Sequence, residues 1–309
     1  MKRILILSVM VALAAPSQAS PLFYDGFNYT AGELLAPVND TTGSPNPGQL
    51  NVDYGVNWRY AGAGAAVNAP PGMASGGLSY PDLAPSTGNS VLFDMTKLGS
   101  ARIQVTPAAI SSDTVYWSGL LQVNSIGTLT TGANGMLLGG FNNTAGAGTL
   151  PTTVNAVLRI RQDTSDPTAY HIGTAMNSGT AAGNIQFDNV TPYAAGQTVF
   201  VVGSYEFVAG TFNDVARMWI NPNSADFGAA SPPSATLTSV PGGSAAELTS
   251  VLTFNLRNVN SVGLPTLQFD ELRVGTTWAD VTPVPEPAAT GLLGLGMLAV
   301  VGWYRLRKR

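Results

Sequence analysis

The chain has 309 residues, with 14 Lys and Arg against 18 Asp and Glu, one His and no Cys. Without Cys there are no disulfides, thiol nucleophiles or thiolate metal sites, and one His excludes a cluster of imidazole ligands. Nucleic-acid binding depends on a surplus of cations, so an acidic chain argues against it. We therefore expect a fold held by its apolar core alone.

The first 19 residues have the pattern of a secretory signal peptide. Lys2 and Arg3 give a positive start, residues 4–15 are apolar, and small residues lead up to Ala19. Signal peptidase reads small residues at such positions, so we predict cleavage between Ala19 and Ser20. The prediction is an exported chain.

The body of the chain is predicted to consist of short strands. Residues 20–90 are rich in turns, and beyond them apolar and polar residues alternate with the period of two that is typical of strands. No stretch sustains a helical period over three turns, which favours an all-β, two-sheet antiparallel sandwich. The predicted strands are Leu22–Tyr29, Ser90–Met95, Ala101–Val105, Thr114–Val123, Val154–Arg161, Val199–Phe207, Val215–Ile220, 252–257 and Leu267–Val274.

For two of these strands the sequence predicts more than where they begin and end. In Val154–Arg161 alternation predicts one apolar face, formed by Val154, Ala156, Leu158 and Ile160, and one polar face, formed by Asn155, Arg159 and Arg161. In Leu267–Val274 the apolar residues Phe269 and Leu272 are three positions apart, so regular alternation would place them on opposite faces of the strand. A bulge is therefore expected between them.

Three segments carry a resemblance to a known fold: Phe23–Tyr29, Leu78–Pro81 and Phe269–Trp278. They resemble the bacterial laminin-G-like, concanavalin A-like jelly rolls. The resemblance implies a jelly-roll sandwich over residues 20–282 whose first and last strands pair, and it suggests carbohydrate or matrix binding.

We found no catalytic constellation. Glycoside hydrolysis needs two carboxylates across a cleft, and enzymes of this fold carry acids two residues apart on one strand. None of the five Glu has an acid two residues away, and the adjacent Asp270 and Glu271 would point to opposite faces. We predict that the body is not an enzyme and has no catalytic residues; a secreted polysaccharide-acting enzyme on the same fold is the alternative.

The resemblance also suggests a calcium-binding site, because sandwiches of this kind often bind calcium through loop carboxylates and carbonyls. Asp25 and Asp270 are the candidate ligands, because pairing of the terminal strands would bring them together. Asp163 and Asp166 lie in a hairpin turn, where capping by their side chains is favoured over metal binding. His171 lies in a short strand and is expected to be a half-exposed surface imidazole.

Aromatic residues could bind a sugar ring. Trp58 and Tyr60 are two residues apart and share one side of a loop-rich segment. They are the candidate ligand-binding residues, although packing against the sandwich is favoured. Trp117, Trp219 and Trp278 are expected to pack in or on the sheets.

The tail, residues 283–309, combines three features in a fixed order. Pro285, Glu286 and Pro287 interrupt regular structure, and the apolar run Ala288–Tyr304 is 17 uncharged residues long, at the short end for a transmembrane helix. A basic stop follows, which keeps that end cytoplasmic; its residues are Arg305, Arg307, Lys308 and Arg309.

This arrangement resembles the PEP-CTERM sorting signal. The resemblance implies recognition by an exosortase, a membrane protease-transpeptidase that cuts near the Pro-Glu-Pro triad in Gram-negative bacteria that make exopolysaccharide. An ordinary anchor that is never cut is the alternative. Without residues 1–19 and 288–309, 8 cations face 18 acids, so the body carries about −10.

Together these features predict an exported cell-surface or biofilm-matrix protein with a structural, adhesive or carbohydrate-binding sandwich. Its expected partners are signal peptidase, exosortase and an exopolysaccharide or other carbohydrate. It would be held in the inner membrane by its tail only until processing.

Overall fold

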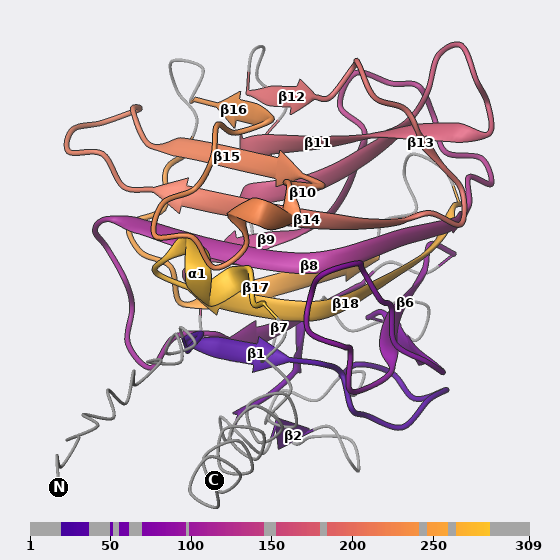
Figure 1. Cartoon of the computed structure of the whole chain (residues 1–309), viewed down its shortest axis with the longest axis horizontal. Coiled ribbons are helices and arrows are strands. Elements are labelled where there is room, and N and C mark those ends of the chain that lie inside the picture. The colour runs from indigo at the N-terminus through magenta and orange to yellow at the C-terminus, as the bar shows by residue number, and fades with distance from the viewer. Residues whose placement is uncertain are drawn as a thin grey trace, which may run out of the picture.

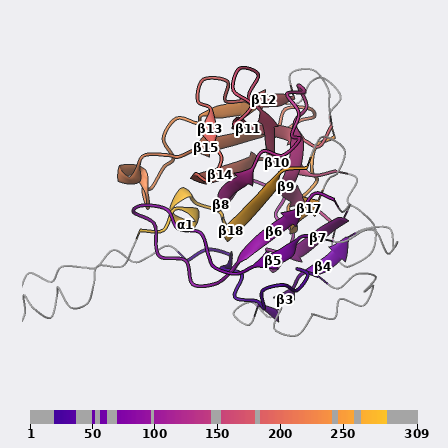
Figure 2. The same cartoon turned by 90° about the vertical axis from the view of Figure 1, so that its right-hand side faces the viewer.

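The computed structural model describes residues 20–36, 50–51, 56–61, 70–96, 99–144, 153–179, 184–240, 246–258 and 264–284. The predicted signal peptide, the triad at 285–287, the apolar run and the basic stop lie outside these residues. Two antiparallel sheets form the two layers of the body (Figures 1 and 2). Within the described part, no helix is long and apolar enough to cross a membrane.

The first sheet, which faces the viewer in Figure 1, has eight strands. Seven of them follow one another in the order β16 (Leu237–Ser239), β15 (Val215–Ile220), β14 (Thr198–Glu206), β8 (Thr114–Ser125), β18 (Thr266–Gly275), β6 (Ser90–Asp94) and β5 (Gly72–Ala74). The eighth strand, β1 (Phe23–Asp25), also pairs with β18.

The second sheet, which lies behind the first in Figure 1, also has eight strands. Their order is β12 (Ile185–Phe187), β11 (Ala169–Asn177), β10 (Asn155–Gln162), β9 (Met136–Asn142), β17 (Thr253–Asn258), β7 (Gly99–Gln104) and β4 (Arg59–Ala61), while β13 (Tyr193–Ala194) pairs with β11. A separate ribbon joins β2 (Leu50–Asn51) to β3 (Val56–Asn57). The predicted two-sheet antiparallel jelly-roll sandwich is confirmed.

The main core lies between the two sheets, because alternate residues of their strands point inward. Trp117 of β8 packs against Phe254 of β17 with ring centroids 5.5 Å apart, and Phe254 stacks on Phe269 of β18 at 6.5 Å. These rings join the first sheet to the second through a continuous apolar cluster. Burial of these aromatic rings, together with the aliphatic residues around them, stabilises a chain that has no disulfides.

A second apolar cluster covers the outer face of the first sheet. Leu120, Phe200 and Trp219 point away from the main core and pack against Trp278 of the short helix α1 (Trp278–Val281) and against loop residues. Trp219 and Trp278 meet edge to face at 5.1 Å. A one-turn 3-10 helix, η1 (Ser224–Asp226), belongs to the same cover, since the indole of Trp278 donates to the carbonyl of Asp226. This part of the face is therefore covered by the chain itself.

The first and last strands of the body pair, as the resemblance implied. β1 runs antiparallel to β18, with Phe23 opposite Val274 and Asp25 opposite Leu272. β6 pairs with the other half of β18, from Thr266 to Phe269. The predicted bulge in β18 is also confirmed, because its register with β8 shifts after Asp270 and Glu271 has a φ of +57°.

One predicted alternation is wrong. Val154 was expected on the same face as Ala156 and Leu158, but it belongs to a small outer cluster with Val157, whereas Ala156 and Leu158 belong to the main core. Ala156 has a φ of +48°, and the register of β10 with β9 shifts at this point. The bulge reverses the side on which the preceding residue lies.

Candidate functional site

Asp25, a predicted calcium ligand, is a buried anchor at the start of the body. Its Oδ1 accepts the backbone N–H of Phe27 at 2.8 Å, and its Oδ2 accepts the Tyr29 hydroxyl at 2.6 Å and the Trp58 indole N–H at 2.8 Å. Burial and the neighbouring carboxylate raise the pKa of Tyr29, so the phenol remains a donor. Both carboxylate oxygens are therefore occupied by hydrogen-bond donors.

Asp270, the second predicted ligand, fastens a loop to the bulge of β18. Its Oδ2 accepts the N–H of Leu78 at 2.6 Å and the Ser86 hydroxyl at 3.0 Å, and its Oδ1 accepts the N–H of Glu271 at 2.8 Å. Burial raises the pKa of Asp270 to about 7. The described residues contain no group of three acids or imidazoles that could hold a metal ion. The donors around Asp25 and Asp270 do not fit a calcium site.

Trp58 and Tyr60, the predicted sugar-binding pair, lie in the core, with exposed fractions of 1% and 2%. The Trp58 ring packs on Phe27 at a centroid distance of 5.9 Å, in addition to its bond to Asp25. Neither ring offers a face to a ligand, which agrees with the packing alternative. Trp117, Trp219 and Trp278 are buried as expected.

The expectation for His171 is wrong, because only 5% of this residue is exposed. Its Nε2 lies 2.5 Å from Oδ2 of Asp163, across the β10–β11 hairpin. Oδ1 of Asp163 accepts the N–H groups of Ser165 and Asp166, and these bonds lower the pKa of Asp163. The acids of this turn are caps, as predicted, and the imidazole is part of the same structural network.

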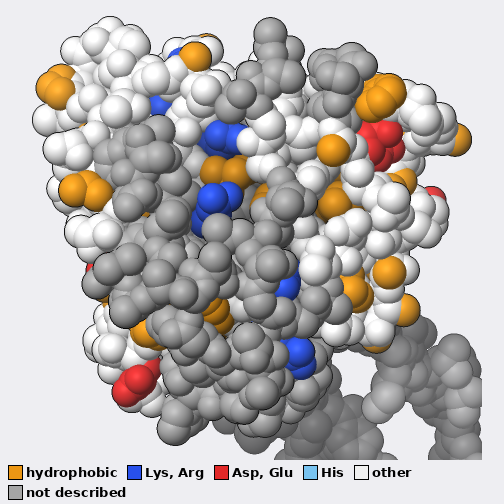
Figure 3. All heavy atoms as spheres, turned by 180° about the vertical axis from the view of Figure 1, so that it is seen from behind, with side chains coloured by type: hydrophobic (Ala, Val, Ile, Leu, Met, Phe, Trp, Pro, Cys, Tyr) orange, Lys and Arg blue, Asp and Glu red, His pale blue; other side chains and the backbone are white. Residues whose placement is uncertain are grey.

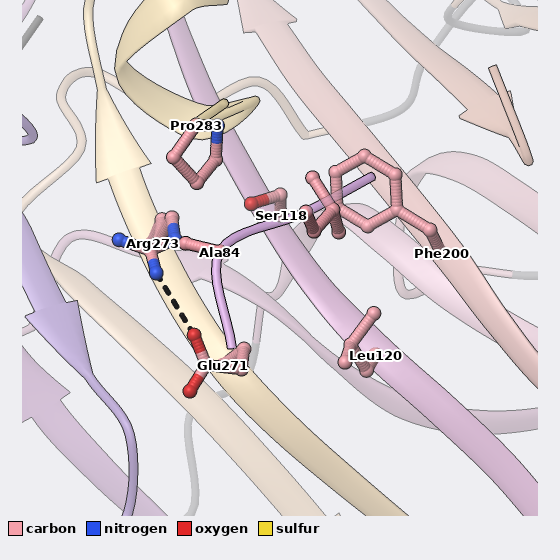
Figure 4. Close-up of a pocket in the computed structure, with 8 residues that line it drawn as sticks. Ala84, Ser118, Leu120, Phe200, Glu271, Arg273 and Pro283 are labelled. Carbon is pink, nitrogen blue, oxygen red and sulfur yellow. Dashed lines mark hydrogen bonds and ion pairs between the residues drawn. The ribbon is translucent and has the colours of Figure 1, made fainter. Parts of the chain in front are cut away.

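A small hollow lies on the outer face of the first sheet (Figure 4). Its free volume of about 10 Å³ is close to that of one water molecule. Two of its charged side chains are paired with each other, Arg273 donating to Glu271 at 2.8 Å, and Glu271 also accepts the Tyr24 hydroxyl at 2.9 Å. Ser118 donates to the carbonyl of Val281. The hollow is too small and too fully bonded to hold a ligand.

Charge is divided between the two sheets. The strands of the first sheet contain Asp25, Asp94, Glu206, Asp270 and Glu271, with only Arg217 and Arg273. The strands of the second sheet contain no Asp or Glu at all, and they hold five of the eight cations of the body: Arg59, Arg102, Arg159, Arg161 and Arg257. Such a division in an acidic body marks the second sheet as the candidate functional surface.

The five arginines lie on the outer face of the second sheet. The alternate positions of these strands, such as Ala101, Ile103, Phe254 and Leu256, belong to the main core, so their neighbours in sequence point outward. We call the five arginines and Asn255 the arginine face. Figure 3, viewed from this side, shows the cationic side chains in a band down the molecule, with acidic atoms at its margins.

Strand register brings several of these residues side by side. Arg59 of β4 lies opposite Arg102 of β7, and Arg102 lies opposite Asn255 of β17. Burial, and then the charge of Arg59, lower the pKa of Arg102. Burial and the charge of Arg257 lower the pKa of Arg159 to about 10. Like charges facing each other in a sheet cost stability. Arg59 and Arg102 form one such pair, whereas Arg159 and Arg257 lie on strands that β9 separates.

Some of these arginines are held by the protein. Arg159 donates to the carbonyls of Asn134 at 2.9 Å and Ser178 at 3.0 Å. Arg161 donates to the side-chain oxygen of Asn189, and its guanidinium lies 4.4 Å from the centroid of the Phe187 ring. Elsewhere in the described part of the chain, His171, Arg217 and Arg273 form ion pairs with acids.

Asn255 is the unusual member of the face. It is fully buried, and neither its Nδ2 nor its Oδ1 has a hydrogen-bond partner in the described structure. An unsatisfied buried polar atom costs about 1–3 kcal/mol, so such atoms are rare in folded proteins. Strand register places the Asn255 amide between Arg102 of β7 and Gly140 of β9. Its donor and its acceptor both lack a hydrogen-bond partner among the described residues there.

The sequence carried a partial signal for this surface. Arg159 and Arg161 were recognised on the polar side of one strand, and Arg257 alternates with core residues in another. Nothing in the sequence showed that these strands join Arg59 and Arg102 in one sheet, because the order of strands in a jelly roll does not follow the order of the chain.

Comparison with protein families finds the PEP-CTERM protein-sorting motif at residues 283–308. The predicted sorting signal is confirmed, and such a motif implies an exported protein that is sorted by an exosortase. The match begins directly after Thr282, whose hydroxyl donates to the carbonyl of Trp278 and accepts the N–H of Gly228. Hydrogen bonds thus tie the chain to the body up to the residue before the motif.

Several solved structures are similar to this chain at low sequence identity. An alginate lyase is 12% identical, with a TM-score of 0.42, over 83% of this chain and 98% of that one. A protein of unknown function from Shewanella oneidensis is 8% identical, with a TM-score of 0.42, over 91% and 99%. The globular domain of T. cruzi calreticulin is 9% identical, with a TM-score of 0.39, over 71% and 84%. No curated protein sequence matches the chain.

Proposed function

We propose that this protein is an exported cell-surface or extracellular-matrix protein that binds carbohydrate on its arginine face. The carrying observation is Asn255, whose buried amide has no partner in the middle of that face. An amide donates and accepts at once, which is the complement of sugar hydroxyls. The outer face of the first sheet, by contrast, carries a cover of loops and α1.

The proposed role is binding without cleavage. Hydrolysis of a glycosidic bond uses two carboxylates, and the strands of the second sheet supply none. The paired acids of the first sheet, Asp270 and Glu271, are committed to Leu78, Ser86, Tyr24 and Arg273. If the protein instead cleaved polysaccharide, incubation with its ligand would shorten the polymer, which size-exclusion chromatography would detect.

A binding experiment tests the carbohydrate role. The full-length protein, purified in detergent, is run by affinity electrophoresis through gels that contain neutral or acidic polysaccharides. Retardation is expected with at least one polymer, and Asn255→Ala should abolish most of it. Because this change removes two unsatisfied buried atoms, it should leave the melting temperature unchanged or higher. Asn124→Ala, on the first sheet, is the control. Absence of retardation in every gel would contradict the proposal.

The sorting steps are also part of the proposal. Signal peptidase would release Ser20, the tail would hold the protein in the inner membrane of a Gram-negative cell, and an exosortase would cut near Pro285–Pro287. Mass spectrometry of the protein from cells with an active exosortase should find the C-terminus near the triad. Glu286→Ala should leave the tail attached, whereas the exposed Glu33→Ala should not. An intact Arg309 in the unaltered protein would favour an uncut anchor.

A further inference from the structure

We infer that the carbohydrate bound on the arginine face is acidic, with carboxylate groups repeated along its chain. This inference rests on the proposed function and adds the chemical class of the ligand. Its starting point is the division of charge, since five of eight body cations share one face with no strand acid beside them.

The first step concerns which arginines can reach a ligand. Within the described part of the chain, Arg59 and Arg257 form no side-chain hydrogen bond or ion pair, and both are half-buried rather than enclosed. Arg159 and Arg161 are fixed by Asn134, Ser178 and Asn189, and so present charge in a set position. The face therefore combines fixed charges with guanidinium groups that still have donors to offer.

The second step concerns the type of anion. A guanidinium presents its N–H donors in a planar fork that matches a carboxylate, which lysine cannot do. The described strands of this sheet contain five Arg and no Lys. Each of these guanidinium groups is therefore of the kind that pairs with a planar anion.

The third step concerns spacing. Arg59 and Arg102 lie on neighbouring strands in register, and strands are about 4.8 Å apart. That is comparable to the length of one hexose unit, so a chain lying across the strands would present one carboxylate per sugar to successive strands. Asn255, next to Arg102 in the same row, would meet a hydroxyl of the sugar.

The fourth step concerns energy. Arg59 faces Arg102, and Arg257 repels Arg159, so the face without a ligand bears unfavourable like-charge contacts. Bound carboxylates would replace repulsion with charge-assisted hydrogen bonds. A polyanion therefore gains more from this face than a neutral glycan of the same shape can.

Titration calorimetry with two matched polymers tests the inference. The full-length protein in detergent is titrated with polygalacturonate and with the same polymer after methyl esterification, which removes charge but keeps the sugar backbone. Polygalacturonate should bind at least about tenfold more tightly, given the strength of charge-assisted bonds. Arg59→Gln and Arg257→Gln should each weaken it about tenfold, and binding should fall as salt is added. Arg217→Gln, an equal loss of charge on the first sheet, should have no effect.

The outcomes separate the inference from the proposed function. Equal affinity for both polymers would overturn the acidic ligand while keeping carbohydrate binding. An equal loss of affinity in Arg217→Gln would overturn the assignment to the arginine face. Tighter binding of dextran sulfate than of polygalacturonate would overturn the choice of carboxylate. Melting temperatures of all variants show that each protein is folded.

Discussion

The indole N–H of Trp58 donates to Oδ2 of Asp25 at 2.8 Å, joining two segments 33 residues apart in the turn-rich start of the body. The same carboxylate accepts from Phe27 and Tyr29. Asp25→Ala would leave three donors without an acceptor in the core. We expect the free energy of unfolding to fall by about 3 kcal/mol or more, measured by urea denaturation with tryptophan fluorescence.

Asp94→Ala is the control for that measurement. Asp94 is exposed and accepts only within its own turn, from the N–H and hydroxyl of Thr96. Its removal should cost about 1 kcal/mol or less. Similar losses in the two variants would contradict the role assigned to Asp25.

The stability of the body should decrease between about pH 4 and pH 7 because of Asp270. Its pKa is about 7 in the folded chain against 3.8 ordinarily, so the folded state holds a proton that the unfolded state releases in this window. The stability that protonated Asp270 provides is complete below pH 3.8 and is lost as the pH rises through 7. The slope contributed by one proton is at most about 1.4 kcal/mol per pH unit.

Asp270→Asn identifies the source of that slope. The amide cannot ionise, yet it keeps an oxygen that can accept from Leu78. Thermal unfolding of the two proteins across this pH range should show a flatter profile for the variant. Superimposable profiles would mean that another group is responsible.

Gly203→Ala should destabilise the centre of the first sheet. A Cβ at this position would lie 2.3 Å from a ring atom of Trp117, which is fully buried and cannot move away. Overpacking of this kind costs about 1–3 kcal/mol. Gly132→Ala, where the new Cβ would lie 3.5 Å from the hydroxyl of Thr130, is the matched control and should change the midpoint of denaturation little.

Chelation of calcium should leave the melting temperature unchanged. A ligand that binds only the folded state would stabilise it, and its removal would lower the midpoint. The oxygens of Asp25 and Asp270 are already paired with donors, so EDTA has no ion to remove from them. A lower melting temperature with EDTA, reversed by calcium, would contradict this prediction.

Local pattern was sufficient for much of the fold. The alternation in Val215–Ile220 predicted its strand limits, and its side chains do alternate, since Ala216 and Met218 are in the main core and Trp219 is in the outer cluster. The difference in parity between Phe269 and Leu272 predicted the bulge of β18. These features depend on neighbouring residues only, which is why the sequence shows them.

Features that depend on distant partners were missed. β9 contains Gly139 and Gly140, which resemble a turn in sequence, but the strand is stabilised by pairing with β10 and β17. His171 was expected near the surface because its neighbours in sequence say nothing of the sheet and turn that enclose it. The arginine face was missed for the same reason, since its members come from four separate strands.

The last strand of the body, β18, lies between β8 and β6 in the middle of the first sheet rather than at its edge. Until residues 266–275 have left the export channel, the two halves of that sheet have nothing to join them. Completion of the fold must therefore follow translocation of nearly the whole body. The sorting motif begins at residue 283 and so follows β18 in the chain. A chain that ends before residue 266 therefore lacks both the central strand of the first sheet and the sorting motif.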